Sequence, residues 1–159
     1  MKKYIVILLG ILVVAAMSSA AFAAAAFHIG ICTGTVSQSE DDLRGAEAMI
    51  AKYGDVSDGG MIKHLTYPDN FMQEMRTTIS QIASLADDPL MKVVIVNQAI
   101  PGTTEGFRRI REKRDDILLF AGEAHEDPGV IESIADLTVN ADNIARGYLI
   151  IAAAKKLGA

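Results

Sequence analysis

The sequence contains one cysteine, Cys32, and no tryptophan. A single thiol allows no disulfide within the chain, so stability has to come from an apolar core, which the hydrophobic half of the residues can supply. Basic side chains are also few, with 15 Lys and Arg against 20 Asp and Glu. This balance argues against nucleic acid and anionic lipid as the main partners. Neither a GxGxxG nor a Walker sequence is present.

The N-terminal 23 residues have the features of a secretory leader. Two lysines precede an apolar run over 4–16, and residues 21–23 read Ala-Phe-Ala, the small-x-small pattern of a cleavage site. The alternative is a membrane anchor, but a spanning helix needs about 20 apolar residues and this run is shorter. We therefore expect a cleaved signal peptide over 1–23 and a periplasmic or secreted domain over 24–159, with a net charge of about −7.

Short apolar runs alternate with amphipathic ones through the rest of the chain. The expected strands cover residues 28–33, 61–67, 92–97, 116–121 and 136–140. The expected helices begin at Ser39, at Asp69 or Asn70, at Thr103 or Thr104, at Asp127 and at Asp142 or Asn143. Continuous apolar strands such as 93–96 are typical of a parallel sheet covered on both faces. The order predicts a three-layer, doubly wound α/β domain.

Ligands of such folds bind beyond the carboxyl ends of the strands, so the loops there hold the candidate site. After the first strand, hydroxyl side chains and a glycine precede the N-terminus of a helix. This loop could bind a ligand at the helix N-terminus, or it could be a turn in which Ser39 caps the helix. Two amides after the third strand suit a neutral polar ligand or turn chemistry. The candidate ligand-binding residues from these loops and the next are Thr33, Gly34, Thr35, Ser37, Asn97, Gln98, Glu123 and His125.

Other chemical interpretations are weaker. The acids around His125 could bind a metal, but Asp127 has a capping role and no second ligand cluster exists elsewhere in the sequence, so we expect no metal and no cofactor. The basic side chains at 108–114 are expected to form a solvated helix face rather than an anion site. Cys32 lies in an apolar strand and is expected to be inert. We find no catalytic set and expect a protein that is not an enzyme.

Two segments carry a resemblance to a known family. From Phe27 to Gly158 the chain resembles the N-terminal lobe of type I periplasmic binding proteins, most strongly at residues 142–147 (Asp-Asn-Ile-Ala-Arg-Gly) and on to Gly158. Lac-repressor-like sensor domains share that fold. More specifically, residues 122–128 (Gly-Glu-Ala-His-Glu-Asp-Pro) and those that follow resemble a family of bacterial periplasmic binding proteins of unassigned function. This resemblance implies a sheet order of 2-1-3-4-5 and a ligand cleft between two lobes, with Asp142 added to the candidate site.

The resemblance also implies a second lobe after Gly158, where this sequence stops at Ala159. We therefore expect a single lobe that offers half a site, binds solutes weakly and tends to self-associate through the surface meant for the other lobe. The expected function is extracytoplasmic binding of a small polar solute, for an ABC-type permease or a membrane sensor. Tyr67, Phe71 and Phe107 are aromatic side chains that could stack on such a solute or simply pack. The alternative function is a flavodoxin-like, FMN-binding redox protein, suggested by the Thr33–Ser37 loop.

Overall fold

The computed structural model describes residues 25–158, so the expected leader lies outside the described residues. Five strands form one parallel sheet in the order β2-β1-β3-β4-β5, which confirms the predicted fold class and strand order. The strands are β1 (His28–Thr33), β2 (Ile62–Thr66), β3 (Met91–Asn97), β4 (Leu118–Gly122) and β5 (Leu137–Val139). Each strand overlaps its predicted range, and the differences are confined to the ends.

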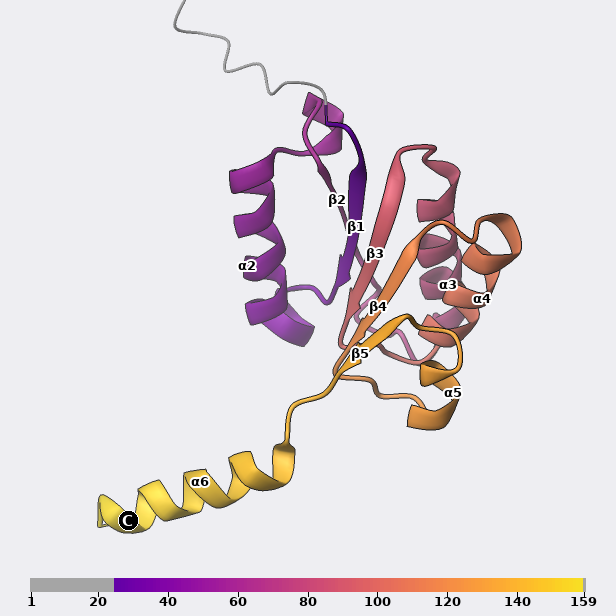
Figure 1. Ribbon diagram of the computed structural model, residues 1–159. Helices are drawn as coiled ribbons and strands as arrows, with labels where there is room; N and C mark the ends of the chain where they lie inside the picture. The colour runs from indigo at the N-terminus through magenta and orange to yellow at the C-terminus, as the bar shows by residue number, and fades with distance from the viewer. Residues whose placement is uncertain (1–24, 159) are drawn as a thin grey trace, which may run out of the picture.

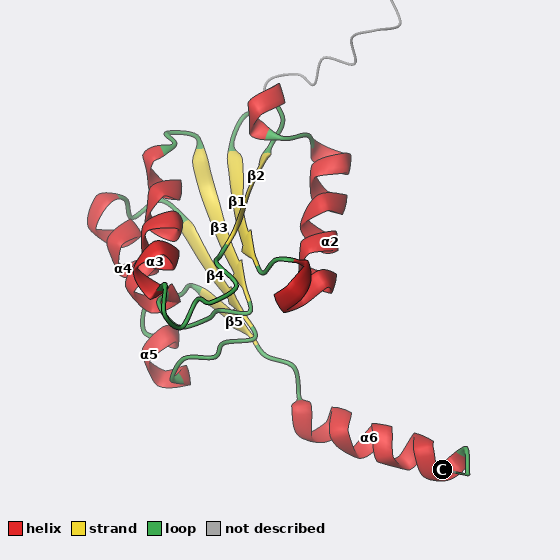
Figure 2. Ribbon diagram, turned by 180° about the vertical axis from the view of Figure 1, so that it is seen from behind, coloured by secondary structure: helices red, strands yellow, loops and turns green. Residues whose placement is uncertain are grey.

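Helices follow the strands on both sides of the sheet (Figure 1). They are α2 (Val36–Tyr53), α3 (Met75–Ser84), α4 (Thr103–Lys113), α5 (Pro128–Glu132) and α6 (Asn143–Lys156), with 3-10 turns η1 (Val56–Asp58) and η2 (Leu85–Asp87). Figure 2 shows α3, α4 and α5 on one side of the sheet and α2 on the other, while α6 extends away from the domain. Within residues 25–158, no helix is both long enough and apolar enough to cross a membrane.

The first helix contains an interruption at the residue predicted to start it. Thr35 caps the opening turn, and Ser39 then has an extended backbone (φ −159°, ψ 85°) before the regular helix continues. The capping interaction differs from the predicted box, because the Ser39 hydroxyl donates to the carboxylate of Asp42 instead of accepting from a backbone amide. Ser39 therefore marks a kink and holds an acidic side chain in place.

The second helix begins later than predicted, at Met75 rather than near Asp69. The reason lies in the contacts of Asp69, which point to a different part of the chain. Its carboxylate accepts the Thr35 hydroxyl, and its carbonyl accepts Nε2 of Gln38 at 2.7 Å. Asp69 is thus tied to the start of α2 and does not cap α3.

The main core lies between the sheet and α3, α4 and α5. Its fully buried members include Val94, Leu119, Ile82 and Phe107, and burying each such side chain contributes roughly 1.5–3 kcal/mol. Helices α3 and α4 approach closely at Gly106 of α4, where an added Cβ would lie 2.8 Å from Cβ of Ile82 in α3. A smaller cluster under α2 contains Ile31, Ala46 and Ile62. Within residues 25–158, the helices cover one face of the sheet well and the other face only in part.

Candidate functional site

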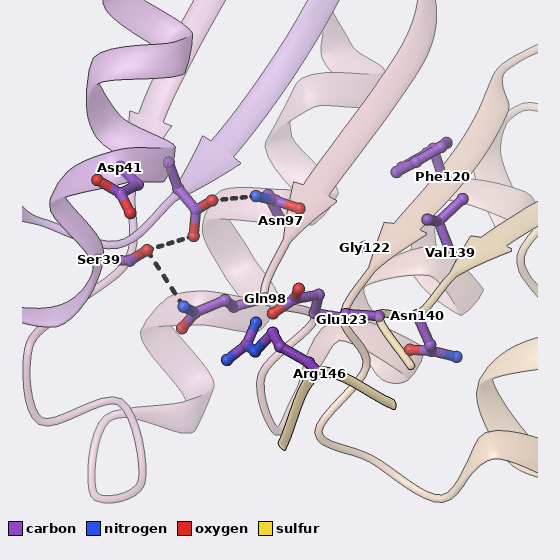
Figure 3. A pocket seen from close by; sticks show the side chains of 12 residues that line it. Ser39, Asp41, Asn97, Gln98, Phe120, Gly122, Glu123, Val139, Asn140 and Arg146 are labelled. Atoms are coloured by element: carbon purple, nitrogen blue, oxygen red, sulfur yellow. Dashed lines mark hydrogen bonds between the residues drawn. The ribbon is translucent and has the colours of Figure 1, made fainter. Parts of the chain in front are cut away.

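A hollow of about 480 Å³ lies at the carboxyl edge of the sheet, where the start of α2, the tips of β3 to β5 and the first turn of α6 meet (Figure 3). Its lining residues are Ser39, Asp41, Asp42, Asn97, Gln98, Phe120, Gly122, Glu123, Val139, Asn140, Ala141 and Arg146. The position agrees with the general rule that open parallel sheets bind ligands beyond their strand ends. We call this hollow the carboxyl-edge pocket.

A closed set of hydrogen bonds joins the tip of β3 to α2. Nδ2 of Asn97 donates to the Asp42 carboxylate, which also accepts the Ser39 hydroxyl. Nε2 of Gln98 donates to the same hydroxyl oxygen at 3.1 Å. Figure 3 draws this set as dashed lines along one wall of the pocket. Because each side chain fixes the next, the amides and the carboxylate form a preorganised polar wall.

Two residues of the pocket adopt left-handed backbone conformations that favour glycine. Gln98 has φ 50° and Glu123 has φ 43°, and they follow β3 and β4, which are neighbouring strands. Holding a side-chain-bearing residue there costs on the order of 1–3 kcal/mol, and such positions cluster at binding and active sites. The surrounding backbone enforces them, since the amide of Ala99 donates to Gly122 at 2.8 Å and that of Glu123 to Val139 at 2.7 Å. Two residues with strained backbone conformations therefore flank one hollow.

The pocket is more acidic than basic. Asp41, Asp42 and Glu123 contribute carboxylates, and Arg146 contributes the cation. Among residues 25–158, Asp41, Glu123 and Arg146 form no ion pair, so their polar groups stay open to a solute. Figure 3 shows Gln98, Glu123 and Arg146 gathered in the middle of the site. The excess of negative charge favours a neutral or cationic ligand over an anion.

Three of the residues predicted from sequence, Asn97, Gln98 and Glu123, line this pocket. The loop after β1 has other contacts. The buried Thr33 hydroxyl donates to the Gly34 carbonyl at 2.9 Å and lies 2.8 Å from Nε2 of His64. Both Thr33 and Gly34 are buried and lie outside the carboxyl-edge pocket. Thr33 instead lines an adjoining hollow, which shares Asp41, Asp42 and Asn97 with that pocket.

The remaining loop residues, Thr35 and Ser37, serve the start of α2. The Thr35 hydroxyl accepts the amide of Ser37 at 3.3 Å and donates to Asp69. Hydrogen bonds from Thr35 and Ser37 lower the pKa of Asp69, which keeps this carboxylate ionised at neutral pH. A negative charge beside the loop is unfavourable for a phosphate there, which weighs against the flavodoxin-like interpretation.

The last two predicted residues also lie outside the pocket lining. His125 is exposed, and its amide donates to the Ala99 carbonyl at 2.9 Å. Asp142 caps α6 by accepting the Ala145 amide at 2.9 Å, and in this way it positions the turn that carries Arg146. Its effect on the site is indirect.

Sequence reasoning missed much of the lining, namely Asp41, Asp42, Phe120, Gly122, Val139, Asn140, Ala141 and Arg146. In β4, Phe120 lies between the buried Leu119 and Ala121, so its side chain faces the other side of the sheet. Nothing in the sequence indicated Asp41 and Asp42, since they read as the acidic first turn of a helix.

Glu126 has a structural role in place of the metal ligation that the sequence left open. Its carboxylate accepts the amides of Gly102 at 2.8 Å and Thr104 at 2.7 Å, together with the Thr104 hydroxyl at 2.5 Å. It therefore caps α4 from a distant loop, because Gly102 offers no side chain for this purpose. The described residues contain no group of three or more potential metal ligands.

The other open interpretations concern buried or paired groups. Burial raises the pKa of Cys32 to about 12, which makes its thiol a poor nucleophile. Tyr67 and Phe107 are fully buried, and Phe71 packs edge-on against Tyr67 with ring centroids 5.8 Å apart, so none of these rings faces the pocket. The basic side chains of 108–114 pair with Glu105, Asp136, Asp87 and Asp116. The described part of α4 therefore offers no open anion site.

Fold and site together define an α/β domain with a polar pocket at the carboxyl edge of a doubly wound sheet. Residues 27–159 match the family described as "Protein of unknown function (DUF3798)", and the chain belongs to this family. A relative from Treponema pallidum (strain Nichols), named "Uncharacterized protein", is 46% identical over 135 residues, which cover 84% of this chain and 61% of the relative. A second protein of that name and organism is 40% identical over 76 residues, covering 48% of this chain and 35% of its own length.

A solved structure shares the fold. It is described as a "Putative transcriptional regulator from Clostridium difficile 630" and superposes with a TM-score of 0.69 at 23% identity, covering 84% of this chain and 38% of that one. At this identity the likeness is one of fold. The chain thus spans about three fifths of its first Treponema relative and less than half of this structure.

Proposed function

We propose that this domain binds a small, uncharged polar solute outside the cytoplasm, as the binding component of an ABC-type importer or of a membrane sensor. The observation that carries the proposal is the carboxyl-edge pocket, in which five segments of the chain bring polar side chains to one hollow. Binding, rather than catalysis, is the proposed activity. The proposal accords with the resemblance to periplasmic binding proteins.

The chemistry of the lining favours this ligand class. The amides of Asn97 and Gln98 both donate and accept hydrogen bonds, while Asp41 and Glu123 accept them from hydroxyl groups. Phe120 adds an apolar surface against which the carbon skeleton of a solute can rest. A neutral, hydroxyl-bearing solute matches all three features, whereas a phosphorylated one meets an excess of carboxylates.

The proposed ligand site can be tested with amide NMR spectra, which detect millimolar binding. Purified, 15N-labelled chain would be titrated with monosaccharides and polyols, with inorganic phosphate as the anionic comparison. We expect a neutral solute to shift the amides of Gln98, Glu123 and Asn140, and phosphate to leave them unchanged. Shifts confined to other parts of the sheet, a preference for phosphate, or no shift at the pocket with any probe would overturn the proposal.

A pair of variants makes this test specific. Replacing Asn97 by Ala removes a pocket amide and the donor to Asp42, and we expect binding to weaken by about 1–3 kcal/mol. Replacing the exposed Thr77 by Ala on α3, which covers the other side of the sheet, should leave binding unchanged. Equal affinities of the two variants would place the binding site elsewhere.

The location outside the cytoplasm is a separate part of the proposal and rests on the leader-like residues 1–23. The full chain with a C-terminal tag would be produced in a bacterium and the mature product analysed by mass spectrometry. We expect the loss of about 23 residues and accumulation outside the inner membrane. An intact N-terminus on a cytoplasmic product would contradict this part while leaving the ligand test unaffected.

A further inference from the structure

The two side-chain amides on the polar wall of the carboxyl-edge pocket each have a fixed direction. An ionised carboxylate can only accept hydrogen bonds, so the Nδ2 group of Asn97 has to face Asp42. The Ser39 hydroxyl donates its one proton to the other carboxylate oxygen of Asp42. Its own oxygen is therefore the acceptor for Nε2 of Gln98 at 3.1 Å. Asp42 thus sets the direction of both amides, one directly and one through Ser39.

The amide oxygens remain available to a solute. Within the described part of the chain, no donor reaches Oδ1 of Asn97 or Oε1 of Gln98, and Figure 3 shows the nitrogen of each amide at a dashed line and its oxygen without one. Oδ1 of Asn97 lies against Gly122, which lines the pocket, because it fills the space that a Cβ would need. Asp41 and Glu123 add carboxylates, which also accept only. Acceptors therefore prevail on the wall formed by α2 and the ends of β3 and β4.

Donors come from the segments after β5. Oδ1 of Asn140 accepts the amide of Ala124 at 3.0 Å, which leaves the Nδ2 group of Asn140 as its unused half. The guanidinium of Arg146 has donors only. The lining of the pocket is therefore directional, with acceptors carried by α2, β3 and β4 and donors carried by the chain that leads into α6.

We propose that Asp42 is the positioning residue that sets this direction, and that the pocket selects a solute with several hydroxyl donors facing Asn97 and Gln98. The inference rests on the proposed binding function and narrows its ligand class. A polyhydroxylated solute can donate an O–H group to each oxygen of the wall, whereas an ether or a phosphate brings an oxygen without a proton against them. Asp42 acts through the two amides, because both its oxygens already accept hydrogen bonds within the wall.

Nuclear Overhauser spectra of the free, labelled chain test the amide directions without any solute. We expect strong contacts from the Nδ2 protons of Asn97 to the Hβ protons of Asp42, and from the Nε2 protons of Gln98 to the Hβ protons of Ser39. Strong contacts from the Nδ2 protons of Asn97 to the Hα protons of Gly122 instead would show that its oxygen faces α2. That result would overturn the proposal.

Two charge-matched variants test the role of Asp42 itself. Asp42→Asn keeps the shape of the side chain but exchanges one acceptor for a donor, so we expect either Asn97 or Gln98 to turn its nitrogen toward the pocket. Asp41→Asn removes the same charge from the neighbouring residue, to which neither amide donates, and should leave both directions unchanged. Identical side-chain amide contacts in the two variants would overturn the proposal.

The choice of solute gives a second readout. Each monosaccharide and polyol of the titration above would be compared with its fully O-methylated ether, which keeps every oxygen and loses every O–H donor. We expect the native chain to bind the free compound about tenfold more tightly or better, equivalent to about 1.4 kcal/mol. In Asp42→Asn this preference should fall by about threefold or more, and inorganic phosphate should gain more affinity than in Asp41→Asn.

The outcomes separate this inference from the proposed function. An unchanged preference in Asp42→Asn, or an equal gain of phosphate affinity in both variants, would overturn the role of Asp42 while solute binding stands. No shift at the pocket with any probe would overturn the solute proposal and the ligand class with it, whereas the amide contacts of the free chain report on Asp42 separately.

Discussion

The side-chain oxygen of Asn97 occupies the space above Gly122 on the neighbouring strand. A Cβ added to Gly122 would lie 2.2 Å from Oδ1 of Asn97, which is a steric clash. The two residues are register partners in β3 and β4, at the wall of the carboxyl-edge pocket. The absence of a side chain at 122 thus allows Asn97 to reach Asp42. This relationship leads to the first prediction.

Replacing Gly122 by Ala should displace the Asn97 side chain and break its hydrogen bond to Asp42. We expect a loss of about 1–3 kcal/mol in the free energy of unfolding, measured with urea, and a shift of the Asn97 side-chain amide signals. Gly147→Ala is the control, because no heavy atom lies within 4 Å of its added Cβ and α6 gains helix propensity. Equal stability of Gly122→Ala and the native chain would contradict the packing described.

Replacing Glu126 by Ala should leave the first turn of α4 without its cap. The carboxylate accepts the amides of Gly102 and Thr104, so we expect a loss of about 1–2 kcal/mol in the free energy of unfolding. Glu112→Ala, at an exposed position of α4, should change stability by much less. Comparable effects of the two substitutions would show that Glu126 contributes only a surface charge.

Replacing Tyr67 by Phe should be neutral or should stabilise the protein by up to about 1 kcal/mol. The Tyr67 hydroxyl is buried and has no hydrogen-bond partner among the described residues, and burial raises its pKa to about 12. Phe keeps the edge-on contact with Phe71 and removes the unpaired oxygen. Tyr67→Ala, which also removes the ring, should cost about 3–5 kcal/mol. Marked destabilisation by Phe in a thermal melt would mean that the hydroxyl has a partner.

His64 should make the stability of the fold depend on pH. Burial lowers its pKa below the ordinary value, against the opposing charges of Glu47 and Asp55. The unfolded chain therefore binds a proton at His64 more readily than the folded chain does. The contribution of neutral His64 to the stability of the fold is complete above the pKa of the unfolded state and is lost as pH falls through the pKa of the folded state. We expect the melting temperature to fall from about pH 7.5 to about pH 5, and to fall less in His64→Gln. Identical profiles for both proteins would exclude His64 as the cause.

The strands and most helix starts could be predicted because their signals are local. Apolar runs such as Val93–Val96 indicate buried strands wherever they occur, and Asp127 followed by Pro128 starts α5 as expected. The start of α3 was wrong, since Asp69 bonds to Thr35 and Gln38, more than 30 positions away. A capping pattern in the sequence does not reveal such a competing partner.

Some residues of the candidate site could likewise be predicted from local signals in the sequence, and others could not. Asn97, Gln98 and Glu123 could be predicted because they follow strands, and parallel strands end at a common edge. Arg146 and Asp42 could not, because their place in the pocket depends on how α6 leaves β5 and how α2 kinks at Ser39. The same limit applies to Thr33 and Thr35, whose hydroxyls are directed by His64 and Asp69.

The fold class, and the carboxyl edge as the place to look for a binding site, follow from the amino-acid sequence alone. Hydrophobic periodicity is a local signal, and the rule that parallel crossovers are right-handed holds for nearly all such folds. Three-dimensional packing was needed to establish which side chains share the carboxyl-edge pocket and that Glu126 caps α4. Each of these outcomes depends on contacts between segments far apart in the chain. Close packing sets their geometry, and no local pattern records it.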